Sequence, residues 1–410
     1  MVTIYRFAIR LAQGAAILTA SALAGCGGSD AAPPPPAPQI VDFPPALPAP
    51  PTQTSAIPRL PPGPHMGVID GFNRFDAQSR DRADRLRDAA IAAGMTIGRA
   101  QIDWRDLEPS PGRFDADALD EVLDRAGRGD VRLFVTLSTL DSEGFTIPED
   151  LSDDADGLRD GLTIDSPELL DRFEALLAWL VPRLTEREVW GLALGNEADI
   201  PIRDTDIPTL AAHDFFARGA ATANRLDPDL AVTLTFTVDP ESRALVDALM
   251  PLFDIASFNF YCSRADGSPD DPAFWRAEIE RIKGLAGQKE IFFQELGCPA
   301  GYDDPAANRT GASADNQRLF FEDMAGIFAE DPQLRAATVF QLFDWEPEVA
   351  AIFGDALRAE GMPEFADRYE EVLETIGLCR WAEESCRPAL DSWLAGLRRL
   401  HEVRAELGSD

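Results

Sequence analysis

Residues 190–200, WGLALGNEADI, raise the question on which the interpretation of this chain depends. A run of Leu, Ala and Gly, apolar enough to be buried, ends at Asn196 and Glu197. Burying a carboxylate without a partner costs free energy, so a strand with this ending needs a use for its Glu. The partners of the Glu197 side chain must therefore be sought elsewhere in the sequence.

Seven other apolar runs of similar length lie before and after this one, and amphipathic stretches separate them. In chain order the eight runs are 65–72, 96–104, 131–139, 189–198, 231–238, 255–262, 291–298 and 337–345. Helical patterns follow several of them, as at 81–94, 115–129 and 209–226, and some end on Gly, which is common after a helix.

A strand followed by a helix, repeated eight times, predicts an α/β protein with a (β/α)8 barrel, the TIM barrel, as one domain over residues 65–410. An open doubly wound sheet is the main alternative. Its dinucleotide-binding form is not supported, because no G-x-G-x-x-G follows the first run.

The charge of the chain limits its partners. The formal net charge of −34 excludes nucleic acid as a partner, because a phosphate backbone requires a basic surface. His65, His213 and His401 lie far apart, and no zinc motif is present. We therefore expect neither a metal nor a cofactor.

The first 64 residues have the pattern of an export signal and a linker. Arg6 and Arg10 precede a short apolar stretch, which predicts a signal peptide over residues 1–25. The sequence LAGC at 23–26 resembles the bacterial lipobox, and this resemblance implies that Cys26 is acylated and becomes the mature N-terminus. The alternative is an ordinary cleaved signal with a chance cysteine.

Gly27, rather than Asp, follows Cys26. In a Gram-negative host this favours a lipid anchor at the cell envelope, in the outer membrane or facing the periplasm. The Pro-rich residues 26–64 predict an extended, disordered linker without a packed core.

The barrel prediction gives Glu197 a partner. Glu197 ends the fourth run and Glu295 ends the seventh. Reactive groups of such barrels lie at the carboxyl ends of the strands, so both side chains should open into one mouth. Two carboxylates that converge there are able to carry out retaining glycoside hydrolysis.

Three motifs support this interpretation: GNEA at 195–198, QELG at 294–297, and IDWRDLEPSPGRFDADALDEVLDRA at 102–126. Together they resemble the clan A glycoside hydrolases, a large group of retaining (β/α)8 enzymes. The resemblance implies that Glu197 is the acid/base, Glu295 the nucleophile and Asn196 a ligand of the sugar 2-hydroxyl. It indicates no single family, and the histidines that cellulases and mannanases place near the sugar are missing.

Three further residues are candidates for substrate binding. Arg99 is expected inside the barrel and needs a carboxylate partner, for which Glu295 is available, although another acidic residue is the alternative. The resemblance implies that the Tyr261 hydroxyl contacts the nucleophile and that Trp345, at the end of the eighth run, offers a flat face to a sugar ring. Packing in the core is the alternative for both.

Other aromatic and acidic side chains are also expected near the mouth of the barrel. Trp104 is expected to be structural. The long acidic loop after the third run is expected to form a wall of a substrate cleft, with Phe145 as a sugar platform. Asp344, beside Trp345, is expected to bind sugar hydroxyls.

Four cysteines remain once Cys26 is set aside. Cys262 and Cys298 follow the sixth and seventh runs, and neighbouring strands lie about 4.8 Å apart, within the reach of a disulfide. Cys379 and Cys386 flank one short segment. We predict the pairs 262–298 and 379–386, with free thiols as the alternative.

Taken together, these features predict a monomeric, surface-anchored retaining β-glycosidase that acts on an extracellular polysaccharide or oligosaccharide. The alternative is a non-catalytic, carbohydrate-binding lipoprotein with the same barrel. The presence of both carboxylates favours the enzyme.

Overall fold

The computed structural model describes residues 57–69, 77–129, 131–142, 144–153, 157–205, 207–262, 272–304, 309–359, 361–380 and 385–408. The predicted signal peptide, Cys26 and most of the Pro-rich segment lie outside the described residues.

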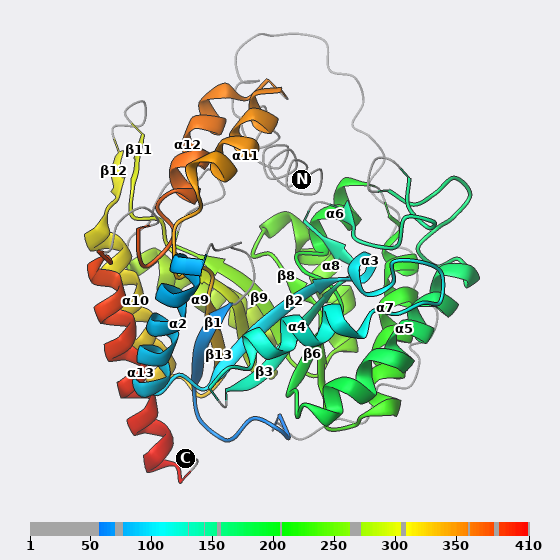
Figure 1. The fold of residues 1–410 in the computed structure, drawn as a ribbon, viewed down its shortest axis with the longest axis horizontal. Coiled ribbons are helices and arrows are strands. Elements are labelled where there is room, and N and C mark those ends of the chain that lie inside the picture. Colours follow the sequence, from blue (N-terminus) through cyan, green and yellow to red (C-terminus); the bar gives the residue numbers. More distant parts are fainter. Residues whose placement is uncertain are drawn as a thin grey trace.

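A parallel sheet forms the centre of the molecule (Figure 1). Its strands are β1 (His65–Ile69), β2 (Ile97–Asp103), β3 (Arg132–Ser138), β6 (Gly191–Ala193), β7 (Ala231–Thr233), β8 (Thr235–Phe236), β9 (Ala256–Tyr261), β10 (Ile291–Gly297) and β13 (Leu334–Val339). Their order in the sheet is β7-β6-β3-β2-β1-β13-β10-β9-β8. Only Leu234 separates the two outermost strands, so they are pieces of one strand and the sheet closes. The predicted (β/α)8 barrel is confirmed.

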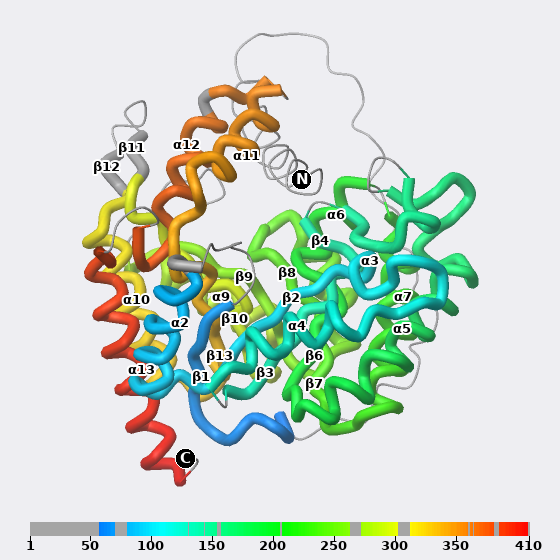
Figure 2. The backbone as a smooth tube through the Cα atoms, in the orientation of Figure 1, coloured from blue at the N-terminus to red at the C-terminus, as the bar shows by residue number. Residues whose placement is uncertain are grey.

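Helices surround this sheet. The longer ones are α2 (Ala77–Ala92), α4 (Ala116–Ala126), α5 (Pro167–Glu186), α7 (Thr209–Leu226), α8 (Arg243–Leu249), α9 (Pro272–Ala286), α10 (Ala314–Glu330) and α13 (Pro388–Glu406). Short pieces occupy the loops: α3 (Trp104–Leu107), α6 (Asp199–Asp204), η1 (Pro240–Ser242) and η2 (Met250–Leu252). The last helix, α13, lies along α10 beside the barrel (Figure 2).

Helix α4 shows how the sequence sets these elements. The Asp115 carboxylate caps its first turn by accepting from the backbone N–H groups of Asp117 and Ala118. Leu119, Leu123 and Ala126 recur at helical spacing and are buried. The helix ends immediately before Gly127.

The floor of the barrel is filled by large aromatic side chains. The ring centroids of Phe134 and Phe292 lie 4.7 Å apart, and Trp190 packs against both rings. Ile57 and Leu60 cover the same cluster. The packed part of the chain therefore includes residues that precede His65, because two apolar side chains of the Pro-rich stretch close the floor.

Several insertions lie at the carboxyl ends of the strands. They are the hairpins β4–β5 (Leu140–Asp141 and Gly144–Phe145) and β11–β12 (Tyr302–Asp304 and Arg309–Ala312), and the helices α11 (Pro347–Ala359) and α12 (Pro363–Leu373). Figure 1 shows α11 and α12 standing beyond the end of the barrel. A cluster that includes Trp345, Phe353 and Tyr369 holds them there.

Both predicted disulfides are confirmed. Cys262 pairs with Cys298, with Cα atoms 5.0 Å apart, and Cys379 pairs with Cys386. The first bond links the carboxyl ends of β9 and β10, and the second closes a short loop before α13.

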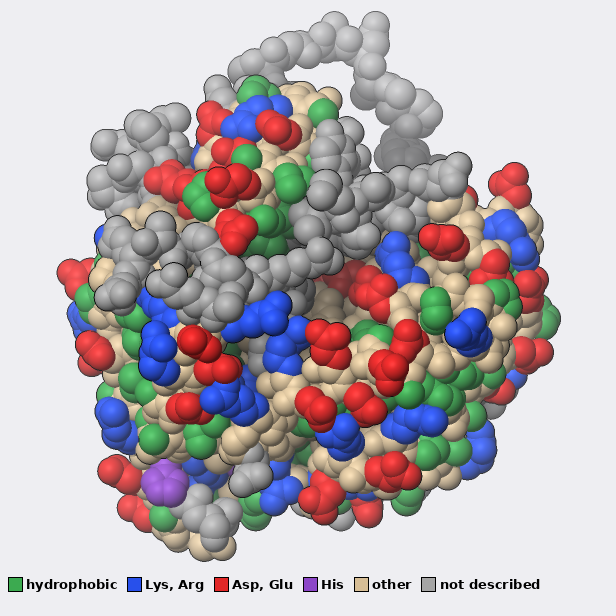
Figure 3. Space-filling model, in the orientation of Figure 1, with side chains coloured by type: hydrophobic (Ala, Val, Ile, Leu, Met, Phe, Trp, Pro, Cys, Tyr) green, Lys and Arg blue, Asp and Glu red, His purple; other side chains and the backbone are tan. Residues whose placement is uncertain are grey.

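The outer surface carries charges of both signs. Figure 3 shows acidic and basic side chains interspersed over one face of the molecule. No helix within the described ranges is both long enough and apolar enough to cross a membrane.

Candidate active site

Glu197 and Glu295 lie at the carboxyl ends of two strands that are far apart in sequence. Glu295 belongs to β10, and Glu197 follows β6, with exposed fractions of 5% and 8%. Glu197 has a φ of 46°, in the left-handed region that non-glycine residues rarely adopt. Backbone strain of this kind concentrates at functional sites, because surrounding structure has to enforce it.

Two donors hold the Glu295 carboxylate. Arg99 Nη1 lies 3.1 Å from Oε1, and the Tyr261 hydroxyl donates to Oε2 at 2.5 Å. Arg99 is fully buried. Both oxygens of Glu295 therefore face a donor, and one donor carries a positive charge. The structure thus gives Arg99 the partner expected for it and gives Tyr261 the contact that the resemblance implied.

Glu197 has a different environment. Asn259, on β9, donates through Nδ2 to Glu197 Oε1 at 2.9 Å. This neutral group is the one hydrogen-bond partner of the Glu197 side chain within the described part of the chain. No positive charge contacts this carboxyl group there.

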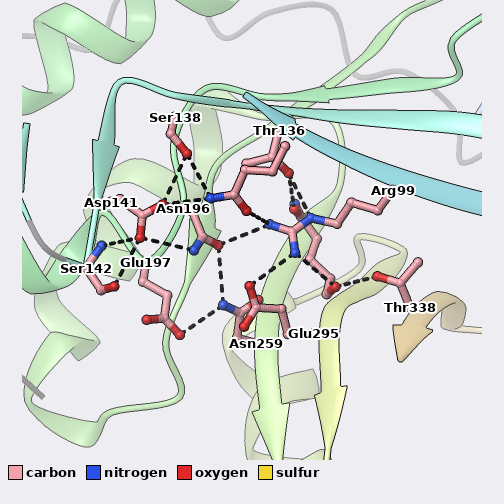
Figure 4. A network of polar contacts seen from close by, with 12 residues as sticks. Arg99, Thr136, Ser138, Asp141, Ser142, Asn196, Glu197, Asn259, Glu295 and Thr338 are labelled. Atoms are coloured by element: carbon pink, nitrogen blue, oxygen red, sulfur yellow. Dashed lines mark hydrogen bonds and ion pairs between the residues drawn. The ribbon is translucent and has the colours of Figure 1, made fainter. Parts of the chain in front are cut away.

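Hydrogen bonds connect the surroundings of the two carboxylates (Figure 4). The Asn196 Oδ1 atom accepts from Arg99 Nη2 at 3.4 Å and from Asn259 Nδ2 at 3.3 Å. Asn196 Nδ2 donates to Asp141 Oδ1 at 3.3 Å. A continuous polar chain therefore runs from Glu295 through Arg99, Asn196 and Asn259 to Glu197.

The two carboxyl groups differ in their pKa values for physical reasons. Burial raises the pKa of Glu197 well above its usual range, and the negative charge of Glu295 raises it further. Burial also raises the pKa of Glu295, but the Arg99 charge and the Tyr261 hydrogen bond oppose that rise. The environment therefore favours the proton on Glu197 over Glu295, because Glu197 has no neighbouring positive charge among the described residues and Glu295 contacts Arg99.

Polar side chains inside the barrel fix Arg99. Its Nε donates to Thr136 Oγ1 at 2.9 Å and its Nη2 to Gln101 Oε1 at 2.8 Å. Gln294 accepts from Thr136 at 2.8 Å and donates to Ser257 at 2.6 Å. These layers of interior side chains leave the guanidinium little freedom to turn away from Glu295.

Sequence reasoning missed Asn259 and Asp141. Asn259 lies two residues before Tyr261 on the same strand, so period-two alternation places both on one face and provided a usable signal. Asp141 lies in the hairpin strand β4, which no pattern predicted. Its carboxylate accepts from Gln101, Ser138, Ser142 and Asn196. Burial raises its pKa, and the Ser142 bonds oppose this rise.

The eighth run is not one strand. Strand β13 ends at Val339, and Trp345 follows in a loop. Its side chain is 8% exposed and forms a T-shaped contact with the Phe353 ring, at a centroid distance of 5.5 Å. The prediction that Trp345 ends the strand is wrong, because the chain leaves the barrel early to form the base of α11 and α12. Trp345 shares their apolar cluster with Tyr261, which keeps it near the mouth.

Two other interpretations need correction. Phe145 is 4% exposed and belongs to the main core, so it is not an open sugar platform. Asp344 forms a two-pronged ion pair with Arg387, at 2.7 and 2.8 Å, and accepts from the Gly377 N–H at 3.0 Å. Its carboxylate therefore anchors the loop that carries the second disulfide.

The stretch after the second strand has a structural role. Trp104 is fully buried, as expected, and donates to Glu108 Oε2 at 2.7 Å. The other Glu108 oxygen accepts from the Gly112 N–H at 2.6 Å and from Arg172 Nε at 2.9 Å. The Trp, Glu and Gly of this motif thus close one loop and tie it to α5. Among the described residues, no group of three or more His, Cys, Asp or Glu side chains is arranged to hold a metal ion.

Neither a family model nor a curated protein sequence matches the chain. Solved structures do match. A GH5_18 protein from Streptomyces cattleya, solved as a glutamate-to-alanine variant in complex with Manβ1-4GlcNAc, has a TM-score of 0.59 and 16% identity, covering 82% of this chain and 81% of that chain. A GH5_18 protein from Bifidobacterium longum subsp. infantis has a TM-score of 0.57 and 17% identity, covering 84% and 79%.

A third similar structure is an exo-β-1,4-mannosidase from Opitutaceae bacterium strain TAV5. Its TM-score is 0.56 at 15% identity, covering 82% of this chain and 60% of that one. Identities this low establish a common barrel fold, while the activity has to be argued from the site.

Proposed function

We propose that this protein is a retaining β-glycosidase, with Glu295 as the nucleophile and Glu197 as the acid/base. The observation that carries the proposal is the unequal environment of the two carboxyl groups. Arg99 and Tyr261 hold both oxygens of Glu295, whereas Glu197 receives one neutral donor. The three structures described above come from proteins named as GH5_18 members or as a mannosidase, which supports this activity.

The proposed reaction has two displacements. A Glu295 oxygen attacks the anomeric carbon, the glycosidic C–O bond breaks, and Glu197 gives its proton to the leaving oxygen. Glu197, now ionised, takes a proton from water, whose oxygen attacks the same carbon and releases Glu295. Each displacement inverts the anomeric centre, so the product retains the configuration of the substrate.

The substrate we propose is a β-linked oligosaccharide or polysaccharide outside the cytoplasm. Manβ1-4GlcNAc is bound in the Streptomyces cattleya structure and in a Bifidobacterium longum one, so β-mannosides belong at the front of a substrate panel. We further propose that the protein acts as a monomer, anchored through a lipid on Cys26 at the outer membrane. The lipobox-like LAGC sequence and the Pro-rich segment after it support this location.

Chemical rescue tests the two roles. Glu295→Ala should abolish turnover, and azide should restore it on an activated aryl glycoside with inverted product, because one displacement has been removed. Glu197→Ala should keep activity on aryl glycosides, whose leaving group needs little protonation, and should lose unactivated substrates. Azide should then give a product of retained configuration.

Glu188→Ala is a matched control. Glu188 is exposed and is the other described non-glycine residue with a positive φ, 53°. This variant should behave as the wild type does. Inversion by the wild-type protein, or near-normal activity in both active-site variants, would contradict the mechanism. Glycan binding without any turnover would support the non-catalytic alternative.

A further inference from the structure

Arg99 determines the orientation of the Asn259 amide through Asn196, which accepts a hydrogen bond from each of these two side chains. A guanidinium has donors and no acceptor, so the Asn196 atom facing Arg99 must be Oδ1. The same oxygen faces the Asn259 amide, which must therefore present its Nδ2. Asp141, an acceptor, faces the other end of Asn196 and agrees with this assignment.

This orientation has a consequence for Glu197. Asn259 Nδ2 also donates to Glu197 Oε1, so that oxygen has to act as an acceptor whether Glu197 is ionised or protonated. This contact favours the proton of the acid form on Oε2, because the carbonyl oxygen of a carboxylic acid accepts more strongly than its hydroxyl oxygen. A neutral amide thus selects which oxygen of Glu197 delivers the proton, and Arg99 fixes that amide.

The other end of the amide lacks a partner. Asn259 is 3% exposed, and its Oδ1 is buried with no hydrogen bond among the described residues. A buried carbonyl oxygen without a donor costs about 1–3 kcal/mol, so native proteins rarely keep one without a reason. The side chain that carries this acceptor contacts Asn196 and Glu197, the two residues for which the resemblance implies contact with the sugar 2-hydroxyl and proton transfer.

We propose that Asn259 is a substrate-binding and positioning residue, which accepts a sugar hydroxyl hydrogen on Oδ1 and holds Glu197 through Nδ2 with its proton on Oε2. This inference rests on the proposed glycosidase function. The ligand chemistry is a hydroxyl donor on the sugar that occupies the site. Binding that sugar satisfies the buried acceptor and keeps the acid oriented toward the leaving oxygen.

Two variants separate the two contacts. Asn259→Ala removes both, whereas Asn259→Asp keeps an acceptor in place of Oδ1 and loses the donor to Glu197. Asn224→Ala is the matched control, because Asn224 lies on α7, outside the barrel, and its buried Oδ1 likewise has no partner within the described ranges. Circular dichroism and the Tm show whether each variant is folded.

The contact of Oδ1 is measured with a series of monodeoxy aryl β-glycosides of the sugar that the wild type prefers. One deoxy position should lower kcat/KM about tenfold for the wild type and the Asn224→Ala control, the value of one lost hydrogen bond. The same deoxy change should cost Asn259→Ala less than about twofold, because its acceptor is already missing. For Asn259→Asp, which keeps an acceptor, kcat/KM should still fall on that deoxy substrate.

The contact of Nδ2 is measured by varying the leaving group. For Asn259→Ala and Asn259→Asp, kcat/KM should fall about 100-fold on alkyl glycosides and less than about tenfold on dinitrophenyl glycosides, which need little acid assistance. Equal losses on both substrates would overturn the positioning role.

If each deoxy substrate lowers kcat/KM by the same factor in Asn259→Ala as in the wild type, the binding role is wrong. If Asn259→Ala does not fold, the leaving-group comparison in Asn259→Asp decides the positioning role. The binding role then requires that kcat/KM of Asn259→Asp fall about tenfold on the same monodeoxy substrate that is poor for the wild type. A wild-type protein that hydrolyses no glycoside would refute the proposed function as well, whereas an active wild type without these effects would refute only this inference.

Discussion

Replacing Arg99 with Met should destabilise the protein in a way that depends on pH. Arg99 is fully buried and donates to Glu295, Thr136, Gln101 and Asn196. Its loss leaves the Glu295 carboxylate buried, and the Tyr261 hydroxyl is then its one remaining donor among the residues that the structure describes. Removing one partner of a buried ion pair costs about 3–5 kcal/mol, a large part of the 5–15 kcal/mol that typically separates folded from unfolded protein.

The sign of the pH dependence follows from Glu295. Burial raises its pKa and Arg99 lowers it, so the pKa rises further in Arg99→Met. A carboxyl group whose folded pKa is raised binds its proton more tightly in the folded state, so its contribution is present at low pH and lost as pH rises through the folded pKa. The destabilisation of Arg99→Met should therefore grow between the wild-type and the variant pKa of Glu295, by about 1.4 kcal/mol per pH unit.

Urea unfolding at pH 5 and pH 8, followed by tryptophan fluorescence with the disulfides intact, provides the measurement. The variant should lose more stability at pH 8 than at pH 5. Adding Glu295→Gln to Arg99→Met should recover about 2 kcal/mol or more at pH 8, because the orphaned charge is gone. Equal losses at both pH values, or strictly additive effects of the two substitutions, would refute this reasoning.

Three other predictions address the site, the disulfides and the anchor. Tyr261→Phe removes a hydrogen bond that lowers the pKa of Glu295, so kcat/KM should fall about 10- to 100-fold and the acidic limb of its pH profile should move to higher pH. Replacing Cys262 and Cys298 together with Ser should cost about 4 kcal/mol of stability, and the same change at Cys379 and Cys386 about 2.5 kcal/mol, because the second loop is shorter; unfolding midpoints that do not differ would contradict this. Cys26→Ser should shift the expressed protein from the membrane to the soluble fraction on centrifugation, and a wild type that is already soluble would disprove lipid anchoring.

Much of the site could be predicted from short-range pattern. Alternation of apolar runs with amphipathic stretches specified the barrel, because each strand and helix must bury one face. The barrel in turn brought Glu197 and Glu295 to one mouth, since parallel strands end on the same side. The same geometry predicted the disulfide between Cys262 and Cys298, which follow neighbouring strands.

Only the tertiary structure shows the hydrogen bonds around the Glu197 and Glu295 carboxyl groups. Asn259 and Asp141 are ordinary polar residues in sequence, and only the closed barrel places them beside Glu197 and Asn196. Trp345 fits the alternation of a strand, yet packing against α11 and α12 removes it from the sheet. The physical reason is the distance along the sequence over which each property is set. Periodicity within one element indicates which of its faces is buried, whereas hydrogen bonds and pKa values depend on side chains that come together only after the whole chain has folded.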